Sequence, residues 1–253
     1  MNNLPVIDAI TVQGTRPKEP ANFADAGESV PVSAKVHDDE TALDQLVYTW
    51  TATSGMFSGT GASVTWTAPE TVAAPAVVTI TLTVTEKYGN PGGPLAFEQS
   101  VKATADLSLH DSMQEVGGMS RQFLLDFSDS GIRDVPYIMR NFSKARCPQP
   151  SEVDSEIGDV TNNRLTLRIV DSRVGNPLTS VGFGGTCPFR GKRGDSCAVV
   201  PVFWDSIELA TNKRGTTSGN DIIAAVYAPA DSRWWLCASD YQGTGSFTSR
   251  FSR

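Results

Sequence analysis

The chain has 253 residues, of which 40% are hydrophobic and 19% are charged, and its formal net charge is -7. This composition supports a sizeable core and excludes a disordered chain. The acidic balance argues against a general nucleic-acid binder, which needs a basic surface to neutralise phosphates. No apolar run approaches the roughly 18 residues that a membrane-spanning helix needs.

The two halves of the chain differ in composition, which indicates two domains. Most of the net negative charge lies in the first 105 residues, whereas all the cysteines follow later. Sustained helical periodicity also begins only after residue 105. We therefore expect one domain over residues 1–105 and a second over residues 106–253.

The first domain is expected to consist of β-strands. Val77–Thr85 alternates apolar residues with threonines, which is typical of a half-buried antiparallel strand. Trp50 lies in the middle of another such run, where we expect it to pack in the core. Further short runs, separated by Gly, Pro and Asp clusters, predict a β-sandwich: Val6–Val12, Ser29–Val36, Leu46–Thr53, Ser63–Thr67 and Phe97–Ala103.

Two stretches of this domain resemble a known family. LVYTWTATSGMFSGTGASVTWTAP followed by VVTITLTVTEKYG is similar to bacterial immunoglobulin-like modules of the PKD and cadherin-like kind. The resemblance implies an all-β immunoglobulin-like sandwich in an exported protein, where such modules serve as spacers or adhesive units. The acidic run Asp38-Asp39-Glu40 offers oxygen ligands for calcium. A solvated loop explains this run as well, and we predict no metal site.

The second domain begins with signals for three helices. Ser112 and Glu115 form a capping box that predicts a helix from residue 112. A second helix is expected from Asp134, with its apolar residues continuing to Phe142, and a third from Ser151. Longer strands follow at residues 165–183, 197–209, 221–228 and 234–241, joined by short turn-rich connections.

The order of helices and strands, with SCAVVPVFWDSIEL, NDIIAAVYAP and RWWLCASDY, resembles the nuclear transport factor two-like superfamily. This resemblance implies an α+β cone-fold domain, with three helices packed on a curved antiparallel sheet. The superfamily includes steroid isomerases and polyketide cyclases as well as many members without catalysis. The cone interior is then the place for a small ligand.

The polar groups expected near such an interior are few. Strand carboxylates Asp205 and Asp240 are the candidates, with Trp204, Tyr227 and Trp234 as pocket walls. Equally, the aromatic residues can be core and the aspartates rim residues. We assign no catalytic residue, metal site or cofactor, because both histidines lie outside the second domain's strands and no Ser-His-Asp set is visible.

The cysteines indicate an oxidising compartment. None has the CxxC spacing of a zinc or redox site, and two disulfides fit an exported domain, with free buried thiols as the alternative. We prefer Cys187 with Cys197, which bracket one turn, and therefore Cys147 with Cys237. Cys197 with Cys237 is disfavoured if another strand separates them, because two strand spacings exceed the reach of a disulfide.

These features favour a non-enzymatic, extracytoplasmic binding or structural protein in a bacterial cell-envelope or surface assembly. The alternative is a small-molecule-binding protein or an isomerase-like or cyclase-like enzyme that uses the cone interior. The basic turn at 189–194 is either a contact for an acidic protein partner or a solvated hairpin tip. A homodimer formed through the open face of the sheet is a further alternative. MNNLPVID lacks the features of a signal peptide, so we expect any export signal to be absent from this mature sequence.

Overall fold

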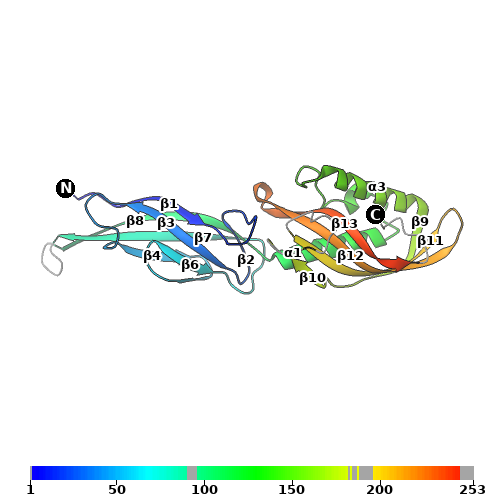
Figure 1. The fold of residues 1–253 in the computed structure, drawn as a ribbon, viewed down its shortest axis with the longest axis horizontal. Helices are drawn as coiled ribbons and strands as arrows, with labels where there is room; N and C mark the ends of the chain where they lie inside the picture. The colour runs from blue at the N-terminus through cyan, green and yellow to red at the C-terminus, as the bar shows by residue number, and fades with distance from the viewer. Residues whose placement is uncertain (1, 90–95, 182, 184–186, 188–195, 246–253) are drawn as a thin grey trace. The chain divides into compact units, whose positions relative to one another are not determined.

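The computed structural model describes residues 2–89, 96–181, 183, 187 and 196–245, and the chain divides into two compact units, Met1–Asp111 and Ser112–Arg253. Figure 1 shows strands throughout the first unit, and helices together with strands in the second. The expected basic turn at 189–194 lies outside the described residues.

The first unit contains two four-stranded sheets. One has the order β1-β3-β6-β5 and the other β2-β8-β7-β4, and buried residues of both sheets share one hydrophobic core. The strands are β1 (Val6–Val12), β2 (Phe23–Asp25), β3 (Ser29–His37), β4 (Val47–Ala52), β5 (Met56–Ser58), β6 (Ser63–Thr67), β7 (Ala76–Gly89) and β8 (Ala96–His110).

Alternation along β7 explains how this core forms. Val78, Ile80, Leu82 and Val84 are all buried, while the threonines between them are partly exposed on the other face. The fully buried tryptophan is Trp66, whose indole Nε1 donates to the Ser54 carbonyl. Trp50 is only partly buried against the core, and its Nε1 donates to the Gly61 carbonyl.

The described residues of the second unit form three α-helices, one short 3-10 helix (Pro229–Asp231) and a five-stranded sheet. The helices are α1 (Ser112–Ser128), α2 (Val135–Ile138) and α3 (Pro150–Thr166). The strands are β9 (Leu167–Val174), β10 (Thr179–Val181), β11 (Ser196–Glu208), β12 (Arg214–Ala228) and β13 (Arg233–Gly245). Its pairing order is β10-β11-β12-β13, and β9 also pairs with β11. The sheet curves beside α1 and α3 (Figure 1), which pack on it along β11 and β13.

The predicted fold class is wrong. Instead of an immunoglobulin-like sandwich joined to a three-helix cone, the described part of the chain is mostly β, with three sheets and about three short helices, and the sheet of the second unit forms a half-barrel. In the first unit, β2 pairs parallel with β8, so that sheet is mixed. In the second, α2 is only four residues long.

The early end of α2 has a physical cause that the spacing of its apolar residues does not reveal. Asp134 caps its first turn, but Phe142 then forms a bridge with Leu236 of β13. Five residues later, Cys147 is bonded to Cys237 of the same strand. The residues between Phe142 and Cys147 form turns rather than further helix, and a helix as short as α2 gains little stability from its own hydrogen bonds.

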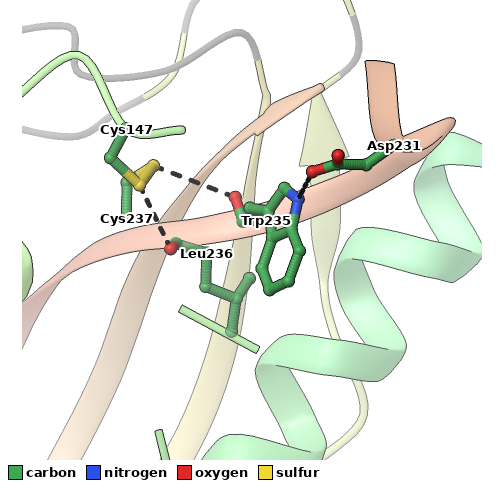
Figure 2. Close-up of a disulfide and its surroundings, with 5 residues drawn as sticks. All are labelled: Cys147, Asp231, Trp235, Leu236 and Cys237. Atoms are coloured by element: carbon green, nitrogen blue, oxygen red, sulfur yellow. Dashed lines mark hydrogen bonds between the residues drawn. A yellow bond between two sulfur atoms is a disulfide. The ribbon is translucent and has the colours of Figure 1, made fainter. Parts of the chain in front are cut away.

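The structure contains the two disulfides preferred from the sequence, Cys147–Cys237 and Cys187–Cys197. Figure 2 shows the first, with Cys147 Sγ 3.4 Å from the Leu236 carbonyl oxygen and Cys237 Sγ 3.9 Å from the Trp235 carbonyl oxygen. A sulfur in a disulfide carries no hydrogen, so we treat both as packing contacts. The Trp235 indole donates to Asp231, at the turn before β13.

An ion pair reinforces this disulfide from the surface. The Arg146 guanidinium donates to both carboxylate oxygens of Asp231, over 2.8 and 2.6 Å. These hydrogen bonds, with the one from Trp235, lower the pKa of Asp231. The segment before α3 is thus attached to the start of β13 by one covalent bond and one bidentate ion pair.

Candidate ligand-binding pocket

A pocket in the second unit lies between its helices and the sheet. Its volume is about 190 Å³, and α1, α3, β11, β12 and β13 all contribute lining residues. Ligand pockets for drug-sized molecules usually measure roughly 300–1,000 Å³. The space therefore suits a ligand of a few heavy atoms. We call it the α3 pocket and define its polar floor by Glu156, Asp221 and Ser239.

Glu156 brings a carboxyl group from α3 to the sheet. It is 9% exposed, and it accepts hydrogen bonds from Ser239 N at 2.8 Å and from Ser239 Oγ at 2.9 Å. Burial raises the pKa of Glu156 to about 8, and the nearby carboxyl of Asp221 adds to the rise. Two hydrogen bonds from one serine oppose this shift without cancelling it.

Asp221 lies beside Glu156 at the floor of the pocket. It faces Tyr241 across the β12–β13 ladder, and Ser239 lies two residues from Tyr241 on the same face. The backbone amides of Asp240 and Ile222 act to lower the pKa of its carboxyl group. Its Oδ1 atom is buried, however, and accepts no hydrogen bond from any residue that the structure describes.

The charge state of Asp221 follows from this environment. Burial, together with the nearby carboxylate of Asp240, raises the pKa of Asp221 to about 7. Burial, and then the charge of Asp221, also raises the pKa of Tyr241. Near neutral pH the pocket therefore holds carboxyl groups that exchange protons readily.

Aromatic rings form the apolar wall of the pocket. Trp204 of β11 packs edge-on against Phe127 of α1, with ring centroids 5.6 Å apart, and lies 5.7 Å from the ring of Tyr241. The indole Nε1 of Trp204 donates to Ser128 Oγ at 2.6 Å, which fixes the ring orientation. Phe123 and Leu124 complete this wall from α1.

The sequence-predicted pocket residues divide between three places. Trp204 and Asp240 line the α3 pocket. Strand alternation, however, places the Asp240 carboxylate on the face opposite Ser239, where it accepts a hydrogen bond from Gln242. Asp205 instead forms an ion pair with Arg214, which lowers the pKa of Asp205.

Tyr227 and Trp234 pack in another part of the second unit. Their rings lie 5.5 Å apart, and both contact Phe183. The indole of Trp234 donates to Ser112 Oγ at the first residue of α1. We therefore regard these two aromatic residues as core residues.

The sequence analysis does not identify Glu156, Asp221 or Tyr241 as pocket residues. For Glu156 and Asp221, however, the surrounding sequence pattern gives an indication. Glu156 falls three residues after Val153 and four before Val160, within the buried stripe of α3. An acidic residue in an apolar stripe indicates a buried carboxyl group. Asp221 directly precedes the apolar run of residues 222–228 within β12, but its nearness to Glu156 depends on strand register, which the sequence does not show.

The carboxyl groups of this pocket can bind a ligand through hydrogen bonds, or they can transfer protons. Among the described residues, no group of three or more His, Cys, Asp or Glu side chains is placed to hold a metal ion.

No helix in the described part of the chain is long and apolar enough to cross a membrane. No family model matches the chain, and no curated protein matches it at a significant level.

Proposed function

We propose that the chain is an extracytoplasmic binding protein whose second unit takes up a small ligand in the α3 pocket. The observation that carries this proposal is the buried Oδ1 of Asp221, which lacks a partner among the described residues and lines a pocket with an aromatic wall. A buried polar atom without a hydrogen bond costs about 1–3 kcal/mol, so a ligand that donates to it gains that energy back. The two disulfides support an oxidising compartment.

In this proposal the first unit presents or docks the second within a cell-envelope or surface assembly. Its β-sheets and its separate hydrophobic core suit a spacer that folds independently of the second unit. The ligand site then belongs entirely to the second unit. We propose no catalytic step for the protein in this role.

Acid–base catalysis is the second candidate function. The observation that favours it is the pair of carboxyl groups with pKa values of about 8 for Glu156 and about 7 for Asp221. Groups that titrate near neutral pH make efficient proton donors and acceptors. However, both oxygens of Glu156 already accept hydrogen bonds from Ser239, which favours a binding role for this residue.

A fragment-binding experiment tests the proposed function. Ser155 lines the pocket from an exposed position of α3, so Ser155→Phe should fill the pocket mouth without disturbing the core. Thr161→Phe is the matched control, because Thr161 is exposed on the same helix but does not line the pocket. Ligand-observed NMR with a library of small fragments should show binding to the native protein and to Thr161→Phe.

Ser155→Phe should lose at least tenfold in affinity for those fragments. If no fragment binds the native protein, or if the bound fragments are indifferent to Ser155→Phe, the α3 pocket is not the ligand site. Circular dichroism of each variant should match that of the native protein, so that lost binding reports the pocket rather than unfolding.

A further inference from the structure

Acidic side chains predominate among the polar residues that the structure describes around the α3 pocket. Its acidic lining residues are Glu152, Glu156, Asp159, Asp221 and Asp240, although the carboxylate of Asp240 lies on the other face of the strand, and none of the described lining residues is Lys, Arg or His. An acidic lining alone does not define a ligand. The buried and unpartnered Oδ1 of Asp221 is the independent observation that points to a donor group in the pocket.

The groups that face Asp221 decide which donor fits best. Glu156 lies near it from α3, Asp159 lines the same pocket, and Tyr241 and Asp240 adjoin it on β13. The residues contributed by α1 and β11 are apolar or aromatic. The charged residues among these described neighbours are acidic, so a cationic donor gains a hydrogen bond to Asp221 and a favourable charge interaction with Glu156.

The aromatic wall extends the same preference. Trp204 and Phe127 present ring surfaces to the pocket, and aromatic faces attract cations within about 6 Å of the ring centre. Their carbon surface also suits a short hydrocarbon chain. A divalent metal ion is a poorer match, because no described group of three acidic, histidine or cysteine side chains is placed to hold one.

Resting on the proposed function, we propose that the α3 pocket selects a small primary-ammonium compound. Its ammonium group would donate to Oδ1 of Asp221 and its hydrocarbon chain would lie against Trp204 and Phe127. An ammonium group carries three N–H donors, so it can satisfy Asp221 and still reach a second acceptor. The pocket volume of about 190 Å³ limits the ligand to a short chain.

This proposal predicts a linked release of protons. The pKa of Asp221 is raised to about 7 and that of Glu156 to about 8, so part of each carboxyl population is protonated near neutral pH. A bound ammonium group favours the ionised carboxylates and lowers both pKa values. Binding should therefore release protons at pH 7, and affinity should rise as pH increases from 6 to 8.

Isothermal titration calorimetry on the full chain tests the proposal with three probes of similar shape. These are n-butylammonium chloride, n-butanol and sodium butyrate. We expect n-butylammonium to bind at least tenfold more tightly than either of the others. Titrations in phosphate and in MOPS, which differ in ionisation enthalpy, should show net proton release for n-butylammonium at pH 7.

Two variants locate the effect. Asp221→Asn should weaken n-butylammonium binding at least tenfold and reduce the proton release, and its melting temperature should not fall, because it removes a buried ionisable group. Asp154→Asn is the matched control on exposed α3 surface, where Asp154 forms an ion pair with the half-exposed Lys144. It should bind like the native protein.

The outcomes separate this inference from the proposed function. If n-butanol or butyrate binds as tightly as n-butylammonium, or if Asp221→Asn leaves the affinity unchanged, the ligand class is wrong while a fragment site blocked by Ser155→Phe still stands. If n-butylammonium fails to bind but fragments bind in the pocket, the inference is again overturned alone. If neither the probes nor the fragments bind, both proposals fall.

Discussion

Glu156 and Asp221 are the two residues on which the chemistry of the second unit depends. Each is a buried carboxyl group that lies near the other, and each has a pKa raised by burial first and by neighbouring carboxylates second. Ser239 satisfies Glu156, whereas Asp221 keeps one oxygen without a described partner. This asymmetry makes Asp221 the contact for a ligand and Glu156 the group that responds to it.

Stability should depend on pH through Glu156. The pKa of Glu156 is about 8 in the folded protein and near its usual 4.5 when unfolded. Folded protein thus binds this proton more tightly, so its stabilising contribution is full below about pH 4.5 and is lost as pH rises to 8. We expect Glu156→Gln to flatten the decline of the second unit's melting temperature between pH 5 and 8.

Differential scanning calorimetry at several pH values measures this effect, with Asp154→Asn as the control that retains the native slope. A Glu156→Gln protein whose melting temperature declines as steeply as that of the native protein would show that Glu156 does not carry the raised pKa.

At this scale the sequence predicted the pocket only in part. Trp204 was identified because an aromatic residue among strand carboxylates suggests a pocket wall. Asp205 is a candidate from the sequence because it is a strand carboxylate, but in the structure it forms an ion pair with Arg214 of the adjacent strand. Asp221 was missed because its role depends on facing Tyr241 in another strand and Glu156 in a helix, contacts that arise only from tertiary packing.

At the scale of elements, α3 holds the end of α1 through one arginine. Arg164 is buried, and its Nη2 donates to the carbonyl oxygens of Asp126, Phe127 and Asp129. The last carbonyl groups of a helix lack partners within it, so this guanidinium acts as a C-terminal cap. It also lies over the ring of Phe127, part of the pocket wall.

We expect Arg164→Met to lower the free energy of unfolding by about 2–4 kcal/mol, because three carbonyl groups lose a charged donor. Arg168→Met is the control, since Arg168 is exposed on β9, and it should change stability by no more than about 0.5 kcal/mol. Urea denaturation followed by circular dichroism gives both numbers. Equal losses in the two variants would contradict the capping role.

The two disulfides should differ in their contributions. Cys147 and Cys237 are 90 residues apart, and Cys187 and Cys197 are 10 apart. In the loop-entropy model, these separations correspond to about 4.6 and about 2.7 kcal/mol of stabilisation. Replacing Cys147 and Cys237 together by serine should therefore destabilise the second unit more than replacing the other pair, as measured by urea denaturation. The reverse order would show that strain or residual structure outweighs loop closure.

The elements themselves were predicted unevenly, for identifiable reasons. Alternation predicted β7, and the capping signals predicted helices near Ser112 and Ser151, because these patterns are local. The extent of α2 and the parallel pairing of β2 with β8 were not predictable, since each depends on a partner far along the chain.

At the scale of the whole molecule, the two units should differ in their response to reductant, because both disulfides lie in the second unit. Both lie in Ser112–Arg253, and the first unit contains no cysteine. Calorimetry of the full chain should show two transitions, of which reductant lowers only the one assigned to the second unit. The same melting temperatures with and without reductant would mean that the disulfides do not support folding.

Thiol counting completes this test of the oxidising compartment. Native protein that was folded under oxidising conditions and then denatured without reductant should expose no free thiol. Four free thiols would show that the protein forms no disulfides, and the main support for an extracytoplasmic location would then be lost.

The central claim is that the α3 pocket is a ligand site built around Asp221, and a high-resolution crystal structure of the native protein tests it most directly. The account predicts an open pocket in which Oδ1 of Asp221 lies within about 3.2 Å of a donor atom from a co-purified ligand, an added n-butylammonium ion or an ordered water. A pocket closed by its own side chains, or an Asp221 carboxyl fully hydrogen-bonded by the protein itself, would contradict the claim.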